Sequence, residues 1–403
     1  MTRATYFSLI LILGALTALG PFTIDMYLPG FPAIAKDLET DLSSVGLSLS
    51  SYFVGISAGQ LLYGPLLDRF GRKKPLYIGL VLYIVATIGC IFVNSIDNFV
   101  ALRFIQAIGS CAAAVASVAM VRDLFPVKDS AKVFSLLMLV VALSPMVAPT
   151  VGGYVTTEFG WHAVFIILTV MGILVLLSSM LWLPDSYKPD TSLSLMPWPI
   201  IKNFLSVLKV PQFYTYTFTA AIAFSALFAY ISGSPKIFMG IFQVSGKVYG
   251  WIFALLSVGF IGASQVNTLL LKRYTSEQII PAALFAQSLT GIFFVIASMN
   301  GWLGLTGTIA VLFVFLCGLG FTNSNAIALA LAPFERNAGT ASSLMGALQM
   351  GIGTLASVLV SLYRSASALP VAVVMACAAI LALLILLTGR RYIAKSNEVS
   401  ILP

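Results

Sequence analysis

The chain has 403 residues, of which 59% are hydrophobic and only 9% charged, and its mean hydropathy is +1.00. A water-soluble protein of this length has no interior large enough for so many apolar side chains, so the composition excludes a soluble globular fold and predicts a lipid environment. The net charge of +8 does not predict a nucleic-acid partner, because the basic residues are spread over short loops without forming a basic stripe.

Apolar runs long enough to cross the hydrocarbon core recur along the whole sequence. We expect the first six membrane-spanning helices at 6–29, 45–66, 76–94, 98–121, 133–156 and 162–183. A proline-rich connection follows, and its tail, PIIKNFLSVLKV, fits a short interfacial helix as well as a plain linker. We expect the second six helices at 211–233, 248–270, 279–299, 304–331, 341–362 and 369–388.

This arrangement predicts an all-α integral membrane protein with twelve transmembrane helices in two pseudo-symmetric six-helix bundles. The expected parts are an N-terminal bundle at 1–183, a cytoplasmic linker at 184–210, and a C-terminal bundle with a short cytoplasmic tail at 211–403. A faint repeat supports the symmetry, because LLDRF and LLKRY both stand after the second helix of a half. Two related bundles with a site between them are typical of transporters.

The distribution of charge predicts the orientation. Most of the 22 Lys and Arg residues fall at the N-terminus and in every second loop, and positive charge collects on the cytoplasmic side of a membrane. Both termini are therefore expected in the cytoplasm. The four cysteines lie singly within expected helices, so we expect no disulfide, no metal and no other cofactor.

Two charged residues fall inside the expected helices. Asp25 is the one acidic residue of 14 placed within a span, and Arg103 is the corresponding exception among the basic residues. A charge in the bilayer costs at least about 2.5–3.5 kcal/mol, so such residues usually mark an ion or substrate pathway, although a structural salt bridge is the alternative. Both lie in the outer half of the membrane, so we expect that they can meet if their helices are neighbours.

Helical spacing places polar and small residues on the faces that carry these charges. One stripe of the first helix consists of Gly14, Ala18, Pro21 and Asp25, and one stripe of the fourth consists of Arg103, Gln106, Ser110 and Ser117. A small-residue face is often only a packing seam. Because the first of these faces ends in a carboxylate and the second begins with an arginine, we expect them to line a wet cavity.

The segment GPLLDRFGRKKPL at 64–76 is the most specific motif of the chain. It is similar to the loop signature G-x-x-x-D-R-x-G-R-K of the major facilitator superfamily, and the matching residues are Gly64, Asp68, Arg69, Gly71, Arg72 and Lys73. On this match the whole chain resembles that superfamily, and it is most like the Bcr/CflA group of twelve-span drug–proton antiporters. The resemblance implies a cytoplasmic gate in which Arg72 reaches Asp123.

Further segments carry the same resemblance. LRFIQAIGSCAAA is similar to the span-four signature R-x-x-Q-G-x-G, with Ala107 where the family has glycine. SPMVAPTVGGYV is similar to the antiporter signature of span five and keeps Pro149, Gly152 and Gly153. Proline and glycine loosen a helix and permit close approach, which suits an element that bends during alternating access. DMYLPGFP, which starts at Asp25, resembles the first-span signature of the group.

The resemblance implies an exporter of lipophilic neutral or cationic drugs, such as antibiotics of the chloramphenicol or bicyclomycin kind. It makes Asp25 the proton-coupling acid, with Arg103 modulating it, and the expected partners are a small-molecule drug, protons and the lipid bilayer. The resemblance also implies a bacterial cytoplasmic (inner) membrane, where we expect a monomer. Our candidates for an apolar cavity wall with a few polar groups are Tyr27, Tyr52, Gln106, Phe224, Tyr230, Asn323 and Gln349.

Other classes fit less well. An ATP-driven pump needs the phosphate loop G-x-x-x-x-G-K-[ST], and the nearest segment, GIFQVSGKV, has the wrong spacing and lacks the final Ser or Thr. A membrane enzyme needs a nucleophile with a base or a set of metal ligands, and a single histidine with one intramembrane acid provides neither, so we expect no enzymatic activity. The alternative that stays open is a proton-coupled transporter of a metabolite, such as a sugar or an amino acid.

Overall fold

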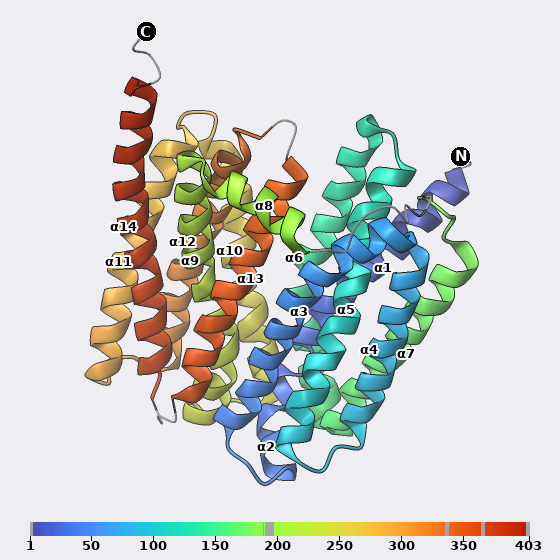
Figure 1. Cartoon of the computed structure of the whole chain (residues 1–403). Helices are drawn as coiled ribbons and strands as arrows, with labels where there is room; N and C mark the ends of the chain where they lie inside the picture. The colour runs from blue at the N-terminus through green and yellow to red at the C-terminus, as the bar shows by residue number, and fades with distance from the viewer. Residues whose placement is uncertain (1–2, 188, 190–196, 335–337, 364–366, 400–403) are drawn as a thin grey trace. The chain divides into compact units, whose positions relative to one another are not determined.

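The computed structural model describes residues 3–187, 189, 197–334, 338–363 and 367–399. Its described elements are all helical, and twelve of them are long and apolar enough to cross a membrane. The predicted fold class, an all-α membrane protein with twelve spans, is therefore confirmed. The chain divides into two compact units (Figure 1): Met1–Leu195 with Gln243–Ala254 form unit 1, and Met196–Phe242 with Leu255–Pro403 form unit 2.

The predicted bundle limits differ from these units in one respect. The unit boundary at Leu195 lies inside the predicted linker 184–210, whereas the short stretch Gln243–Ala254 belongs to unit 1 although the sequence assigns it to the second bundle. This stretch contains the first turns of α10 (Gly246–Leu270), which pack on glycines of unit 1. Close packing at glycines has no periodic signature, so the spacing of apolar residues did not indicate it.

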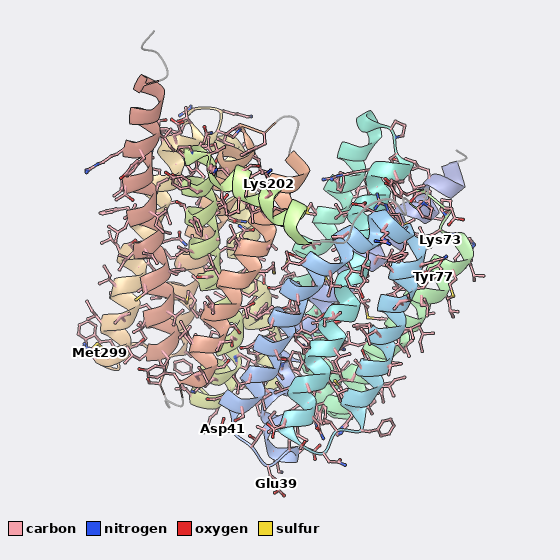
Figure 2. The ribbon with its side chains drawn as sticks, viewed as in Figure 1. Glu39, Asp41, Lys73, Tyr77, Lys202 and Met299 are labelled. Atoms are coloured by element: carbon pink, nitrogen blue, oxygen red, sulfur yellow. The ribbon has the colours of Figure 1, made fainter. Side chains whose placement is uncertain are left out.

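Unit 1 contains most of the candidate residues. Its helices are α1 (Arg3–Asp25), the 3₁₀ turn η1 (Leu28–Gly30), α2 (Phe31–Asp37), α3 (Leu42–Phe70), α4 (Lys73–Ile91), α5 (Ile96–Leu124), α6 (Val127–Phe159) and α7 (Trp161–Trp182). In Figure 2, Glu39 and Asp41 lie at one end of this unit, and Lys73 lies at the other. The acidic connection between α2 and α3 and the basic connection between α3 and α4 are thus on opposite ends.

Local chemistry explains where these helices begin and end. Asp41 caps α3 by accepting a hydrogen bond from the Ser44 backbone N–H at 2.7 Å, and Ser95 caps α5 in the same way. Gly71 ends α3 and Gly160 ends α6, both with φ +82°, a conformation that residues with a Cβ rarely adopt. These turns bring α4 and α7 back across the unit.

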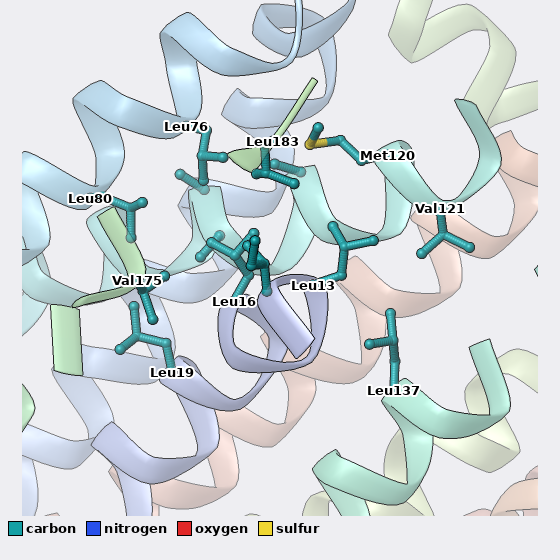
Figure 3. Packing of buried hydrophobic residues seen from close by; sticks show 14 of the residues in the cluster. Leu13, Leu16, Leu19, Leu76, Leu80, Met120, Val121, Leu137, Val175 and Leu183 are labelled. Carbon is teal, nitrogen blue, oxygen red and sulfur yellow. The ribbon is translucent and has the colours of Figure 1, made fainter. Parts of the chain in front are cut away.

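The interior of unit 1 is built around α1, which packs against α5, α6 and α7. Figure 3 shows Leu13, Leu16 and Leu19 of α1 among buried side chains of the neighbouring helices. The outer faces are different, since Ile78 exposes 69% and Leu174 exposes 60% of its surface. Large apolar side chains in contact with the surroundings are expected where the solvent is lipid.

Unit 2 is arranged around α9, which packs against α12, α13 and α14, while α11 packs against α12 and α14. Its elements are α8 (Pro197–Leu208), α9 (Pro211–Pro235), the π-helical turn η2 (Lys236–Ile241), the rest of α10, α11 (Ser276–Met299), α12 (Leu305–Leu331), α13 (Ala338–Leu362) and α14 (Leu369–Val399). In this unit Lys202 and Met299 lie at opposite ends (Figure 2). The tail of the linker is helical as α8, whereas its location at the membrane interface stays a prediction.

Candidate functional site

Asp25 is the last residue of α1, and its side chain is only 3% exposed. The Oδ1 atom is buried, and no described residue donates a hydrogen bond to it. The regular helix stops here, four residues earlier than the expected limit at 29, and the chain continues through η1. A carboxyl group therefore lies buried at a helix break with an unused acceptor.

The backbone next to Asp25 is held by α6. A Cβ atom added to Gly152 would overlap the Met26 carbonyl oxygen and lie 2.8 Å from its carbon. The next residue, Gly153, makes a similar approach to the Gly246 carbonyl. The glycine pair of the span-five signature thus lets α6 touch two segments at once, the chain beyond Asp25 on one side and the start of α10 on the other.

Arg103 lies on α5, fully buried at 0% exposure. Its Nη1 donates to Gln106 Oε1 at 2.6 Å, and its Nη2 donates to the carbonyl oxygen of Thr23 on α1 at 3.1 Å. Its Nε is buried, and no described residue accepts from it. Gln106 in turn donates to the Thr87 hydroxyl at 2.8 Å, so this cation is held by a network over α1, α4 and α5.

Two aromatic rings enclose the same guanidinium. Its central carbon lies 4.1 Å from the ring centre of Tyr27 and 4.4 Å from that of Tyr52, and Phe165 is 5.9 Å away. The hydroxyl of Tyr52 pairs with Ser110 at 2.7 Å. Cation–π contacts of this kind stabilise a cation most where water is excluded. Three candidates for substrate contact, Tyr27, Tyr52 and Gln106, therefore surround Arg103.

Two expectations about the charged residues need correction. No ion pair joins Asp25 and Arg103 in the ranges that the structure describes, although Arg103 reaches α1 two residues before the acid. The reason is the set of bonds and rings around the guanidinium, which hold it elsewhere. The polar stripe of α5 also does not line a wet cavity, because Ser110 and Ser117 are buried and bonded to neighbouring helices, Ser117 to the Leu13 carbonyl at 3.0 Å.

The loop between α3 and α4 forms the second charged cluster. Arg72 Nε donates to Asp123 Oδ2 at 2.8 Å, and its Nη1 donates to Asp68 Oδ1 at 2.7 Å. Burial alone would lower the pKa of Arg72, but the hydrogen bonds and charges of Asp123 and Asp68 outweigh it and raise the pKa above its usual value. The expected reach from Arg72 to Asp123 is therefore present. Lys73 pairs instead with Asp185 at 3.4 Å.

The chain after α7 also contacts this cluster, and no motif or spacing in the sequence indicates that contact. The Tyr187 ring lies 4.2 Å from the Arg72 guanidinium carbon, and the Ser186 hydroxyl donates to Asp123 at 3.2 Å. The remaining signature residues lie around the turn. They are Gly64 and Arg69 within α3, and Gly71 at its C-terminal end.

The candidates of unit 2 occupy three helices. Phe224 and Tyr230 are on α9, with the Tyr230 side chain 2% exposed. Asn323 of α12 accepts a hydrogen bond from Gln349 of α13 at 3.0 Å. The Phe224 ring packs with Phe228 and Phe260, at centre distances of 5.7 Å and 6.4 Å. The structure joins Asn323 to Gln349, and Tyr230 is more fully buried than Phe224.

Comparison with known proteins places this geometry in a family. The sequence model of the Major Facilitator Superfamily matches residues 13–358. The bicyclomycin resistance protein homolog of Haemophilus influenzae is 34% identical over 378 residues, which cover 94% of this chain and 95% of the relative. The chloramphenicol resistance protein of Pseudomonas aeruginosa is 29% identical over 371 residues, 90% of this chain and 86% of the relative.

The solved structures agree on the fold. The crystal structure of a D-xylose–proton symporter superposes with a TM-score of 0.74 over 94% of this chain and 97% of the symporter chain. The two sequences are only 15% identical, so this likeness supports the fold and carries no information on the cargo.

Proposed function

This chain belongs to the major facilitator superfamily, and we propose that it is a proton-driven multidrug exporter that works by alternating access. It is a transporter and not an enzyme. The proposed cargo is a lipophilic neutral or cationic small molecule, of the chloramphenicol or bicyclomycin kind. The names of two relatives support this class, since they are a bicyclomycin resistance protein homolog and a chloramphenicol resistance protein.

The observation that carries the proton coupling is the burial of Asp25 without a partner for its Oδ1 atom. The free energies of the neutral and charged forms of such a carboxyl depend strongly on nearby water and charge. A movement that wets the site or brings a cation close therefore changes how tightly the proton is held. In the proposed cycle Asp25 releases its proton to the cytoplasm, and cargo binding competes with the proton, which gives antiport.

Arg103 is the proposed cation whose distance from Asp25 changes during the cycle. It reaches the Thr23 carbonyl, close to Asp25, and has an unused Nε donor. A small shift of α1 relative to α5 would change the distance between the cation and the carboxyl, and the Coulomb energy of charges at low dielectric varies steeply with that distance. The aromatic rings and Gln106 would limit this shift by holding the guanidinium.

The loop cluster of Arg72, Asp68 and Asp123 is the proposed cytoplasmic gate. Its ion pairs would hold one conformation and break in the other. Gly152 and Gly153, which let α6 pack closely on its neighbours, are the proposed flexible element. We further propose that the chain works as a monomer in the bacterial inner membrane, with both termini in the cytoplasm, because most Lys and Arg side chains then face that side.

The proposal is tested by transport in liposomes that contain the purified protein. An imposed pH gradient is expected to drive uphill accumulation of chloramphenicol, and Asp25→Asn is expected to abolish it. The same variant is expected to retain exchange of labelled for unlabelled drug, which needs no net proton movement. Asp97→Asn, the same change on the exposed first turn of α5, is the matched control and should transport normally.

Two results would contradict the proposal in different ways. Gradient-driven transport that persists in Asp25→Asn at the wild-type rate would remove Asp25 from the coupling. Transport that requires ATP and ignores the pH gradient would remove the whole class. A panel that includes sugars and amino acids covers the alternative cargo, because a metabolite transporter would carry one of them and leave the drugs outside.

A further inference from the structure

Two amide side chains meet within the membrane-spanning helices of unit 2. Gln349 of α13 donates through Nε2 to Oδ1 of Asn323 on α12 at 3.0 Å. Gln349 is 8% exposed, and Asn323 is half-buried. No Asp, Glu, Lys or Arg lies within five residues of either amide along the chain. The pair is thus polar but uncharged.

Asn323 and Gln349 retain hydrogen-bonding groups without a partner among the described residues, whereas the nearby amide of Asn325 has partners for its own. Asn325, two residues further on, donates to Asn267 and to the Phe321 carbonyl, and it accepts from Ser276. In contrast, no described residue accepts from Asn323 Nδ2 or donates to Gln349 Oε1. Unused amide groups are costly against acyl chains, so this face is one that water or a ligand reaches.

Contacts between α9 and α13 show that these helices run in the same direction. Phe228 packs its ring on Gly353, where an added Cβ would lie 2.6 Å from the ring. One turn further along both helices, the Ser232 hydroxyl donates to the Ser357 carbonyl at 3.4 Å. Residues four positions earlier on each helix are therefore also at one level.

Those earlier residues are Phe224 on α9 and Gln349 on α13. The aromatic ring and the amide pair consequently lie at the same depth of the unit. Phe224 is half-buried, and its ring packs with Phe260 of α10 at a centre distance of 6.4 Å. Two helices, α9 and α10, therefore supply aromatic rings at this depth.

The contacts between α10 and α12 bring Asn323 to this level as well. Gly320 packs against the Phe260 backbone, and the hydroxyls of Ser264 and Ser324 pair at 3.1 Å. Asn323 lies one turn from Gly320 on the same face of α12. Four helices thus place two phenyl rings and two amides within about one helical turn, or roughly 5 Å, of depth.

We propose that Phe224, Phe260, Asn323 and Gln349 form a binding site, the amide–phenyl site, for uncharged cargo with an aromatic ring and an amide or hydroxyl group. This inference deepens the proposed function, on which it rests. The rings supply apolar contact, the free Asn323 N–H groups donate to a carbonyl or hydroxyl oxygen, and the Gln349 carbonyl accepts from an N–H or O–H. Because the site contains no charge, it distinguishes cargo molecules by their hydrogen-bonding groups. Cationic cargo is bound instead by the carboxylate of Asp25 in unit 1.

The test measures binding and transport of two probes. Chloramphenicol is neutral and has a ring, an amide and hydroxyls, whereas ethidium is a cation with no amide. Asn323→Leu and Gln349→Met remove the amides while keeping similar volume. Gln265→Met is the matched control, because Gln265 is an exposed amide on α10 and is not one of the four residues of the amide–phenyl site.

Each amide variant is expected to weaken equilibrium binding of labelled chloramphenicol to the detergent-purified protein by about 3- to 10-fold, the range for one lost hydrogen bond. Ethidium binding is expected to stay within twofold of the wild type, which also shows that the variant is folded. If Asn323→Leu does not fold, Gln349→Met alone decides.

Equal losses for both probes, or unchanged chloramphenicol binding in a folded variant, would overturn the amide–phenyl site. Failure of the proposed function gives a different result. In that case the wild-type protein shows no transport driven by a pH gradient, while the binding difference between the two probes still decides whether the site exists.

Discussion

Gly152→Ala gives the sharpest test of how α6 supports the acid. The glycine lies against the carbonyl group of Met26, directly after Asp25. An alanine Cβ would overlap the carbonyl oxygen and lie 2.8 Å from the carbonyl carbon. Carbon atoms in contact prefer separations of about 3.5–4.0 Å, so α6 and the chain beyond Asp25 must separate by roughly 1 Å.

The energetic cost follows from that displacement. Overpacking of this kind typically destabilises by about 1–3 kcal/mol. Alanine also favours a helix over glycine by roughly 1 kcal/mol, so the expected net loss is about 0–2 kcal/mol. Transport should suffer more than stability, because the moved backbone carries the Asp25 carboxyl. A change of this size in the position of a reacting group can reduce a rate on the order of a hundredfold.

The assay pairs gradient-driven chloramphenicol transport with thermal unfolding in detergent. Gly20→Ala on α1 and Gly351→Ala on α13 are the controls, since nothing lies within 4 Å of a Cβ at either position. Both controls are expected to transport normally and to unfold at the wild-type temperature or slightly above it. A Gly152→Ala protein that transports as fast as Gly20→Ala would refute the reasoning.

The remaining predictions concern the two charged clusters. Asp123→Asn is expected to slow transport more than Asp68→Asn. The Asp123 side chain is 15% exposed and the Asp68 side chain is 51% exposed, and exposed ion pairs contribute little to stability. Equal transport rates in the two variants would count against the proposed gate. Arg103→Lys should lower transport at least tenfold despite the retained charge, since an ammonium group cannot reproduce the fork of the guanidinium; near-normal rates would show that charge alone suffices. Tyr187→Leu should destabilise the protein by about 0.5–1 kcal/mol relative to Tyr187→Phe in thermal unfolding, because only the ring stacks on Arg72; identical values would mean that the stacking contributes nothing.

The spans and the contact between Arg72 and Asp123 could be predicted from the sequence because both depend on short-range order. A run of apolar residues crosses a membrane whatever its neighbours are, so the twelve helices needed no tertiary information. Arg72 and Asp123 each stand at a helix end at the same membrane face, and a long guanidinium side chain tolerates errors in position. The contact could therefore be inferred from the motif.

The relation of Asp25 to Arg103 could not be predicted in the same way. The residue counts predict equal depth, and the two helices do touch at Thr23, two residues before Asp25. Whether an ion pair forms depends on rotation of α1 and α5 about their axes and on competing partners. Gln106 lies three residues after Arg103 on the stripe that the helical spacing indicates, but Tyr27 and Tyr52 come from two other segments, and no spacing rule connects them to Arg103.

The two tyrosine rings around Arg103 also limit which side chains can attract a cationic drug. Tyr27 and Tyr52 are the obvious aromatic surfaces near the acid, but their rings already bind the guanidinium of Arg103 at 4.1 Å and 4.4 Å. A cationic cargo would have to displace a cation that is fixed to the chain, at the cost of leaving a buried charge without its partners. On the proposed function, attraction of a cation in unit 1 therefore comes from the Asp25 carboxylate. Tyr52→Phe keeps the ring and should leave ethidium transport within twofold of the wild type, whereas Asp25→Asn should abolish it.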